Sequence, residues 1–211
     1  QMTAVQGNKD IGVSMEGYVA TVEMRRPPNN FLDIELIDNL ATVLEALDDV
    51  HECRAVVLCA EGKHFCAGAN LQKRIDDEAA GKAVLRPRHL YHEARRLVST
   101  RKPIVAAVHG SAIGAGLGLA LVADFRVTCK ESRLACNFAA LGYHPGFGMT
   151  YTLPRLVGHQ TARWLAFTGR RVPGDEAVKM GLADRLADQE SVRKVAQEMA
   201  ADLAKIAPLS L

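Results

Sequence analysis

Two apolar runs in the sequence each lead into a glycine-rich segment, and this repeated pattern constrains the fold more than any other feature. The run Ala55–Cys59 precedes the first glycine segment, Gly62–Leu71, and the run Ile104–Val108 precedes the second glycine segment, His109–Gly118. Strands that are apolar throughout, rather than at alternate positions, are typical of a sheet covered on both faces. Because helical patterns lie between and after these strands, the sequence predicts an α/β fold with a helical C-terminal portion.

The glycine segments also have a chemical use. Glycine and alanine leave the backbone uncovered, so a ligand can approach the N–H groups closely. A helix that starts at such a turn adds unpaired N–H donors and the positive end of its dipole. Two turns of this kind side by side can hold an oxygen that becomes negative during a reaction. The alternative is tight packing of helix on strand, which explains either segment alone more easily than both together.

Other glycine motifs do not fit these residues. Gly114, Gly116 and Gly118 follow a strand, but their spacing is not GxGxxG, and no acidic residue follows at the distance that dinucleotide binding requires. The sequence contains neither the P-loop pattern GxxxxGK[ST] nor the GxSxG turn of serine hydrolases. Nucleotide phosphate binding and serine hydrolysis are therefore not predicted.

Further elements are predicted around the two apolar strands. The chain is interpreted as one domain, 1–211, with a core at about 11–187 and a helical region at about 188–211. The stretch Lys73–Lys82 is predicted to be a surface segment or solvated helix that could act as a lid. The predicted strands are a hairpin of Ile11–Met15 and Tyr18–Met24, followed later in the chain by Phe125–Cys129 and Arg133–Cys136. The predicted helices before residue 125 are one capped by Asp33 with apolar Leu36, Ile37, Leu40, Val43, Leu44 and Leu47, one marked by Leu90, Ala94, Leu97 and Val98, and one through Ala120. Further helices are predicted from about Gly148, with stops at Gly158 and Gly181 and Asp175 in a first turn, and a last helix from Glu190 to Ile206.

Composition narrows the function classes. The 26 basic and 24 acidic residues nearly balance, which argues against a dedicated binder of nucleic acid or of a membrane surface. The longest uncharged run, Pro103–Ala123, is broken by His109, Ser111 and glycines, so no transmembrane span is predicted. No secretory signal is visible, and the five cysteines are odd in number without a CxxC pair, so reduced thiols in the cytoplasm are expected. Cys66 and His64 lack a second pair of zinc ligands, so no metal site is predicted.

Five ordered segments resemble the enoyl-CoA hydratase/isomerase (crotonase) family from about Val13 to the end of the chain. The second glycine segment with its strand resembles the family's strand leading into NGxAxGGG, and the first resembles FxAGxDL with Asn70 in place of the aspartate. The matching segments are Arg26-Pro27, Phe65–Leu71, Ala106–Gly116, Ala123–Arg126, and the pair Pro145–Gly148 and Pro154–Gly158, which is similar to PGxGG…LPRLVG.

The resemblance implies a spiral of ββα units closing on helices, assembled as a homotrimer or a dimer of trimers. It implies an acyl-CoA substrate, with coenzyme A as part of the thioester and not as a separately bound cofactor. The oxyanion hole would be the backbone N–H groups of Ala69 and Ala115. The backbone of Ala67, Gly68, Asn70 and Leu71 would meet the adenine end of coenzyme A, and Arg26 would lie near the point where the ligand enters. Asn70 removes a charge but leaves these backbone groups in place.

Two glutamates add water across the 2,3 double bond in the family's hydratases, and here they fall at Gly118 and Phe138, neither of which is acidic. His144 is the best substitute, since its ordinary pKa suits acid–base work near neutrality, although a loop histidine bonded to a carbonyl is the alternative. Tyr143 could orient a water or donate a proton. We expect structural roles for the remaining candidates: a hydrogen bond from His109, a brace from Asp124 behind the glycine helix, and core thiols at Cys66 and Cys136.

The resemblance therefore predicts an enzyme that stabilises a thioester enolate, through isomerisation, hydrolysis, decarboxylation or C–C cleavage. The alternative is a crotonase-fold protein that binds CoA esters, or a macromolecular partner such as RNA, without turnover. Family members continue well beyond a segment like Ala207-Pro208-Leu209, and we expect that continuation to cover the acyl pocket and to add contacts across the trimer.

Overall fold

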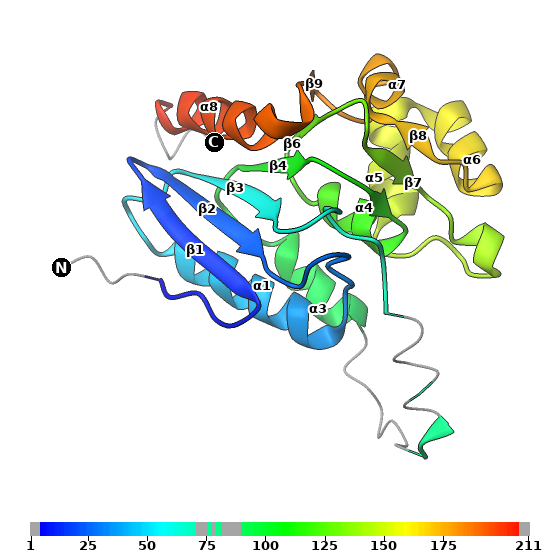
Figure 1. Cartoon of the computed structure of the whole chain (residues 1–211), viewed down its shortest axis with the longest axis horizontal. Helices are drawn as coiled ribbons and strands as arrows, with labels where there is room; N and C mark the ends of the chain where they lie inside the picture. Colours follow the sequence, from blue (N-terminus) through cyan, green and yellow to red (C-terminus); the bar gives the residue numbers. More distant parts are fainter. Residues whose placement is uncertain (1–4, 71–75, 77–78, 82–89, 207–211) are drawn as a thin grey trace.

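A six-stranded sheet forms the larger layer of the computed structural model, which describes residues 5–70, 76, 79–81 and 90–206 (Figure 1). The strand order is β1-β2-β3-β4-β6-β9, and every pair after the first is parallel. Parallel neighbours joined through helices are expected of an α/β chain. The strands are β1 (Ile11–Glu16), β2 (Val19–Met24), β3 (Ala55–Ala60), β4 (Ile104–Val108), β6 (Phe125–Thr128) and β9 (Arg185–Leu186).

The first two strands form the predicted hairpin. Ile11 pairs with Met24 and Glu16 pairs with Val19, so the turn consists of Gly17 and Tyr18. Gly17 has a φ of +57°, a conformation that glycine adopts without steric cost and that a tight hairpin turn requires. The hairpin predicted from alternation and β-branched content is confirmed, but Glu16 belongs to β1, and Tyr18, which was assigned to the second strand, lies in the turn.

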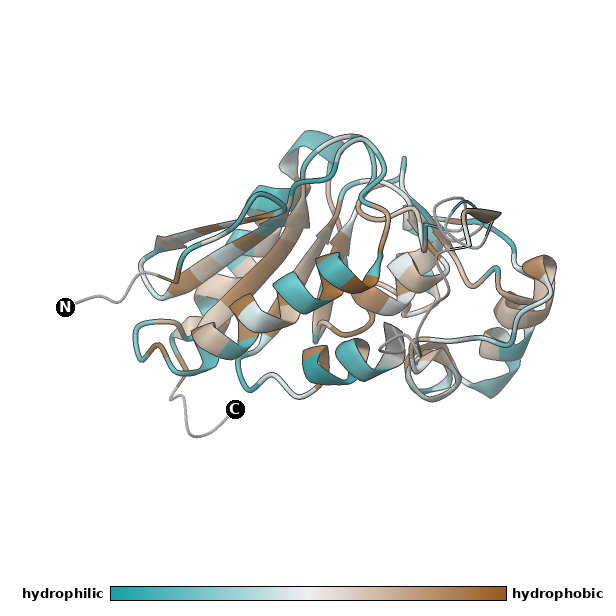
Figure 2. Cartoon of the chain, turned by 90° about the horizontal axis from the view of Figure 1, so that it is seen from below, coloured by the Kyte–Doolittle hydropathy of each residue, from teal (hydrophilic) through white to brown (hydrophobic). Residues whose placement is uncertain are grey.

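Strands β3 and β4 are buried on both faces, as their uninterrupted apolar sequences predict. On one face, Leu58 and Val108 pack in the core cluster that includes the apolar side of α1 (Ile34–Asp48) and Leu97 of α3 (Leu90–Leu97). On the other face, Val57 and Ala107 pack against α8 (Val192–Ala204). Figure 2 shows the strands mainly in hydrophobic colours and the helices in alternating colours. The sheet is therefore the middle layer of three.

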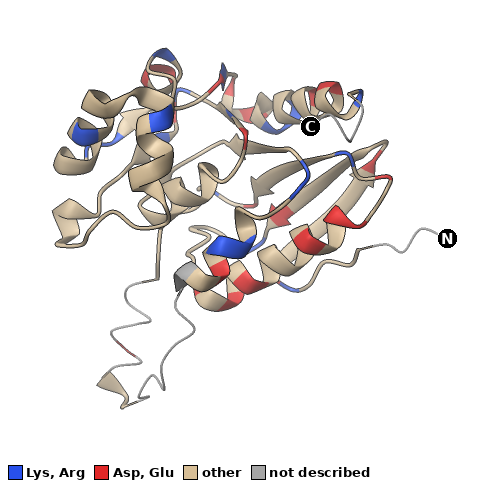
Figure 3. Ribbon diagram, turned by 180° about the vertical axis from the view of Figure 1, so that it is seen from behind, with Lys and Arg blue, Asp and Glu red and all other residues tan. Residues whose placement is uncertain are grey.

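The helices that cover the sheet follow the predicted patterns, with one error. The Asp33 side chain accepts a hydrogen bond from Leu36 N at 2.9 Å, which caps α1 as expected. Acidic residues line α1 beside the arginines of α3 (Figure 3), and Arg96 of α3 forms ion pairs with Asp38 and Glu45 of α1. Val98 was assigned to the apolar face of α3, but it follows the end of the helix and is 61% exposed, so that assignment is wrong.

A second, three-stranded sheet was not predicted. It consists of β5 (Ala112–Ile113), β7 (Arg133–Ala135) and β8 (Val172–Pro173), in the order β5-β7-β8. Strands of two residues are too short for an alternation pattern to reveal them. β9 was missed for the same reason. The small sheet matters because it fixes the second glycine segment in place.

The C-terminal part is mostly helical, as predicted. Gly158 ends α5 and precedes α6, and Asp175 lies in the first turn of α7. The predicted last helix begins two residues later than expected and ends two earlier, after the short 3₁₀ turn η2. None of the helices in the described ranges is long and apolar enough to cross a membrane. Leu71 and most of Lys73–Lys82 lie outside the described residues. The elements are α4 (Ala115–Ala120), η1 (Ala139–Leu141), α5 (Met149–Val157), α6 (His159–Thr168), α7 (Gly174–Lys179) and η2 (Gln189–Ser191).

Candidate active site

Backbone hydrogen bonds hold the two glycine segments side by side. Cys66 N donates to Ser111 O and Ile113 N donates to Cys66 O, each at 3.0 Å, so the two segments pair like parallel strands. Gly114 N then donates to Ala135 O of β7 at 2.8 Å. The second segment is therefore fixed on both sides, by the first segment and by the small sheet.

Glycine is required at two points where the segments approach each other. A Cβ atom on Gly116 would lie 2.1 Å from Cys66 O, far inside van der Waals contact. Gly68 has a φ of +106°, and a Cβ atom there would lie 2.9 Å from Ile113 O. The glycines that the sequence places in these segments thus allow close approach of backbone to backbone. Packing explains these two glycines, as the alternative interpretation proposed.

Several N–H groups at this junction have no acceptor among the described residues, and those of Ala69 and of the first residues of α4 are among them. Ala115 is the first residue of α4, and Ala69 follows Gly68. Their neighbours are paired: Asn70 N donates to Leu32 O at 3.1 Å, and Gly118 N donates to Gly114 O at 3.1 Å. Within the described residues, the N–H groups of Ala69 and Ala115 donate to no protein group. Ala115 is buried and Ala69 is half-buried. Backbone donors shielded from water are rarely left unpaired, so these two are available to a ligand oxygen.

Phenylalanine side chains lie at or beside positions 118 and 138, where carboxylates were expected. A Cβ atom on Gly118 would lie 2.5 Å from Cβ of Phe147 and 2.8 Å from its Cγ. The ring of Phe138 lies near Gly114, with its Cε2 4.0 Å from the place of a Cβ on that glycine. The structure therefore puts phenylalanine side chains along α4 at the sites where a general acid and base were expected.

Asn137 is a polar residue beside the site that sequence reasoning missed. Its Oδ1 lies 3.0 Å from the place of a Cβ on Gly114, next to the first turn of α4. Its position, two residues after β7 and directly before Phe138, was the available signal. An amide has donors and acceptors but does not titrate, so Asn137 can orient a group and cannot act as a base near neutral pH.

His144 and Tyr143 lie on an exposed loop between η1 and α5. Tyr143 is 50% exposed, and its backbone N–H donates to Phe138 O at 2.9 Å. His144 is exposed as well. Among the described residues, neither side chain has a hydrogen bond to either glycine segment. Their catalytic roles stay predictions.

Arg26 is already engaged by three carboxylates, of which that of Glu35 is the most distant at 3.5 Å. Its guanidinium donates to Asp10 at 2.8 Å and to Asp33, the cap of α1, at 2.7 Å. Burial opposes its charge, but the hydrogen bonds with Asp10 and Asp33 raise its pKa above the ordinary value. The same hydrogen bond lowers the pKa of Asp10. The structure thus shows Arg26 joining the start of β1 to α1, and its predicted contact with a ligand stays a prediction.

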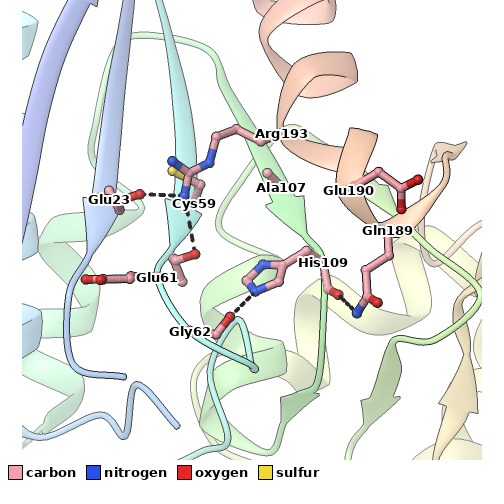
Figure 4. Close-up of a pocket in the computed structure, with 10 residues that line it drawn as sticks. Glu23, Cys59, Glu61, Gly62, Ala107, His109, Gln189, Glu190 and Arg193 are labelled. Carbon is pink, nitrogen blue, oxygen red and sulfur yellow. Dashed lines mark hydrogen bonds and ion pairs between the residues drawn. The ribbon is translucent and has the colours of Figure 1, made fainter. Parts of the chain in front are cut away.

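A hollow of about 310 Å³ lies on the opposite face of the sheet, under the start of α8 (Figure 4). Its polar groups bind one another: His109 Nε2 is 2.8 Å from Gly62 O, Gln189 Nε2 donates to His109 O at 3.0 Å, and Arg193 pairs with Glu23. His109 therefore has the structural role that was predicted. Gly62 and His109 of the two glycine segments line this hollow, but Ala69 and Ala115 do not.

Other candidate groups prove structural. Asp124 Oδ2 accepts from Ile104 N at 2.8 Å and braces the start of β4, as predicted. Burial raises the pKa of the Cys66 thiol to about 12 and that of Cys136 to about 11, so both are protonated core thiols near neutral pH, as predicted. Within the described ranges, no three His, Cys, Asp or Glu side chains gather as metal ligands.

Known proteins match this chain over nearly its whole length. A family model described as enoyl-CoA hydratase/isomerase matches residues 14–211. The short-chain-enoyl-CoA hydratase of Clostridium acetobutylicum is 32% identical over 200 residues, which are 93% of this chain and 76% of that protein. The crystal structure of enoyl-CoA hydratase from Bacillus anthracis has a TM-score of 0.84 and 30% identity over 94% of this chain and 78% of that one. An enoyl-CoA hydratase/isomerase from Pseudoalteromonas atlantica has a TM-score of 0.84 and 30% identity, covering 96% and 79% of the two chains.

Proposed function

Because the chain belongs to the enoyl-CoA hydratase/isomerase family and has the crotonase fold, we propose that it acts on an acyl-CoA thioester and stabilises the thioester enolate. The observation that carries this proposal is the pair of unpaired N–H groups on Ala69 and Ala115. Two donors aimed at one oxygen favour the enolate over the neutral thioester, because a hydrogen bond strengthens as its acceptor gains charge. The backbone pairing of the glycine segments fixes both donors before any ligand binds.

The proposed binding of coenzyme A uses the first glycine segment. The hydrogen bonds already formed there limit which backbone groups can meet the ligand. The N–H groups of Ala67 and Asn70 already donate to Asn29 O and Leu32 O, at 2.9 and 3.1 Å. We therefore assign the adenine amino group to carbonyl acceptors of the segment around Gly68, rather than to these N–H groups. Arg26 is proposed to lie near this end, and Leu71 is outside the described residues.

The aromatic surroundings of α4 argue against hydration by a pair of glutamates. The remaining reactions are isomerisation, decarboxylation and C–C cleavage, which form an enolate, and hydrolysis, which forms a tetrahedral oxyanion. These reactions differ in the acid or base they need. Loss of CO₂ from a thioester with a carboxylate on its α-carbon leaves its bonding electrons as the enolate, without a base. Of these reactions, decarboxylation therefore needs the fewest acid or base side chains around Gly114 and Gly118. The proton that later reaches the α-carbon is assigned to His144 or to a water oriented by Tyr143.

The test is a panel of thioesters followed by absorbance and mass spectrometry. The panel contains crotonyl-CoA, a 3-enoyl-CoA, a branched acyl-CoA, a β-keto acyl-CoA and an α-carboxyacyl-CoA. We expect conversion of at least one thioester other than crotonyl-CoA. Hydration of crotonyl-CoA as the main activity would contradict the argument from Gly118 and Phe138.

A second candidate function is binding of CoA esters without turnover. The observation that favours it is the absence of an acidic residue at Gly118 and Phe138, the two positions where the family's hydratases carry their glutamates. Isothermal titration against the same panel separates the two functions. Binding with no conversion of any member supports this second function, and conversion of one member excludes it.

We also propose that the protein assembles as a homotrimer or a dimer of trimers. Large aromatic side chains on α5 and α6 support an interface there, since Tyr151 is 65%, Trp164 is 61% and Phe167 is 76% exposed. Sedimentation of the 22.9 kDa chain tests this. We expect three or six times the mass of one chain, and a monomer would contradict the proposal.

A further inference from the structure

Phe147 has an unusual backbone and a buried ring. Its φ is +56°, in the left-handed region that bulky residues seldom adopt. The next residue, Gly148, is also left-handed, with a φ of +71°, so the chain turns sharply before α5. The Phe147 side chain is nevertheless only 8% exposed and packs in the core cluster that contains α4. An unfavourable backbone conformation persists only where the surrounding contacts outweigh its cost.

Those contacts are made at Gly118. A Cβ atom on Gly118 would lie 2.5, 2.8 and 2.9 Å from Cβ, Cγ and Cδ1 of Phe147, which means that even a methyl group has no room there. The Phe147 ring therefore occupies the space into which a side chain at position 118 would project. Gly118 and Phe147 form a complementary pair, in which one residue lacks a side chain and the other fills its place.

The ring lies next to the proposed oxyanion hole. Gly118 is three residues after Ala115 in α4, so the two lie on the same side of the helix, about 4.5 Å apart along its axis. A Cα–Cβ bond in a helix tilts toward the N-terminus, so the space filled by Phe147 lies toward the first turn, where the Ala115 N–H is unpaired. An acyl chain that starts from a carbonyl held at Ala115 meets this ring within its first few carbons.

We propose that Phe147 determines substrate specificity: its ring, accommodated by Gly118, closes the acyl pocket beside Ala115 and restricts the protein to short acyl chains. The inference rests on the proposed function, because it takes the thioester carbonyl to be held by the Ala115 N–H. Phe138, whose ring lies near Gly114, adds a second apolar wall. The class of ligand is therefore a CoA thioester whose acyl group is short and apolar near C2 and C3.

The packing of the pair is tested without any ligand. Gly118→Ala in the wild type is expected to lower the thermal midpoint by at least about 4 °C, because the methyl group collides with the Phe147 ring. In a Phe147→Ala background the same substitution is expected to raise the midpoint, because alanine is the better helix former and the ring is gone. The same change of midpoint in both backgrounds would overturn the pairing.

The specificity is tested with acetyl-, butyryl-, hexanoyl- and octanoyl-CoA by isothermal titration. The wild type should gain no affinity beyond butyryl-CoA. Phe147→Ala should bind octanoyl-CoA at least about tenfold more tightly than butyryl-CoA, since each buried CH₂ adds roughly three- to fourfold. Phe147→Leu should fall between the two. Leu47→Ala, which removes a buried side chain from α1 far along the chain from α4, is the matched control and should keep the wild-type profile.

Each other outcome contradicts the inference in a recognisable way. If Phe147→Ala changes the affinity for all four thioesters by the same factor, Phe147 is a packing residue only. If the wild type already prefers octanoyl-CoA, the ring does not close the pocket. If none of the thioesters binds the wild type, the proposed function fails, and the specificity inference fails with it, whereas the midpoint measurements still report on the packing pair.

Discussion

The two glycine segments and the segment 137–148 contribute to the candidate site in different ways. In the glycine segments, backbone hydrogen bonds from Cys66, Ile113 and Gly114 leave two N–H groups unpaired and fix where they lie. In the segment 137–148, the side chains matter, and the structure buries Phe147 while it leaves Tyr143 and His144 exposed. The groups proposed to polarise a carbonyl thus belong to the backbone, and the groups proposed to move protons are individual side chains.

This difference separates the part of the candidate site that depends on backbone pairing from the part that depends on side chains. The backbone pairing of Cys66 with Ile113 uses no side chain at position 118 or 138. The proposed oxyanion hole of Ala69 and Ala115 therefore does not depend on which side chains carry out proton transfer. The predictions below separate the two regions, beginning with the substitution expected to have the largest effect.

Ala115→Pro removes one donor of the proposed oxyanion hole. Proline is tolerated at the first position of a helix, which Ala115 occupies in α4, so we expect the variant to fold. Turnover of the best substrate should fall at least about a hundredfold, since loss of one such donor costs on the order of 3 kcal/mol in the transition state. Steady-state kinetics measure this, and Ala115→Gly, which keeps the N–H, is the control. Turnover near the wild-type value in folded Ala115→Pro would remove Ala115 from the site.

His144→Gln tests whether the exposed loop moves protons. If His144 is the acid or base, turnover should fall by about a hundredfold, and the pH–rate profile should lose one of its limbs. Tyr143→Phe, which removes only the neighbouring hydroxyl, is the matched variant and should keep that limb. An unchanged profile for His144→Gln would exclude it from the mechanism.

Gly116→Ala tests the close approach of the two glycine segments. The added methyl group would lie 2.1 Å from Cys66 O and 2.8 Å from Cys66 C, and both atoms are backbone. We expect the free energy of unfolding to fall by about 2 kcal/mol, as for other overpacked sites. Urea denaturation measures it. Gly116 lies in α4 and has no left-handed φ, so without the collision alanine would be the better helix former there. A variant at least as stable as the wild type would contradict the close approach.

The sequence predicted the parts of the structure that local patterns specify. The hairpin, the capped helix α1, the buried strands β3 and β4 and the backbone of both glycine segments follow from alternation, helical spacing and small residues. The second sheet could not be predicted, because Ala112–Ile113 and Val172–Pro173 are too short to show a pattern. Nor could the contact of Phe147 with Gly118, because the two residues are distant in the sequence and meet only when α4 packs against the loop before α5.

Arg26→Gln has the smallest expected effect. It tests whether Arg26 only joins β1 to α1 or also contacts coenzyme A. Its partner Asp10 has a pKa below the ordinary value because of the hydrogen bond with Arg26. The stabilisation from this pair is therefore present above the unfolded pKa of Asp10 and is lost as the pH falls through the lower folded pKa. We expect Arg26→Gln to reduce the free energy of unfolding by about 1 kcal/mol at pH 6, with the difference from wild type shrinking toward pH 3.

The dissociation constant of coenzyme A measured on the same Arg26→Gln variant completes the test. If Arg26 only joins β1 to α1 through Asp10 and Asp33, the affinity at pH 7 should match that of Asp10→Asn, which breaks the same network and leaves the arginine in place. A larger loss of affinity in Arg26→Gln than in Asp10→Asn would show that the guanidinium itself meets the ligand. Arg26 would then be a side chain that serves the binding of coenzyme A beside a site otherwise built from backbone groups.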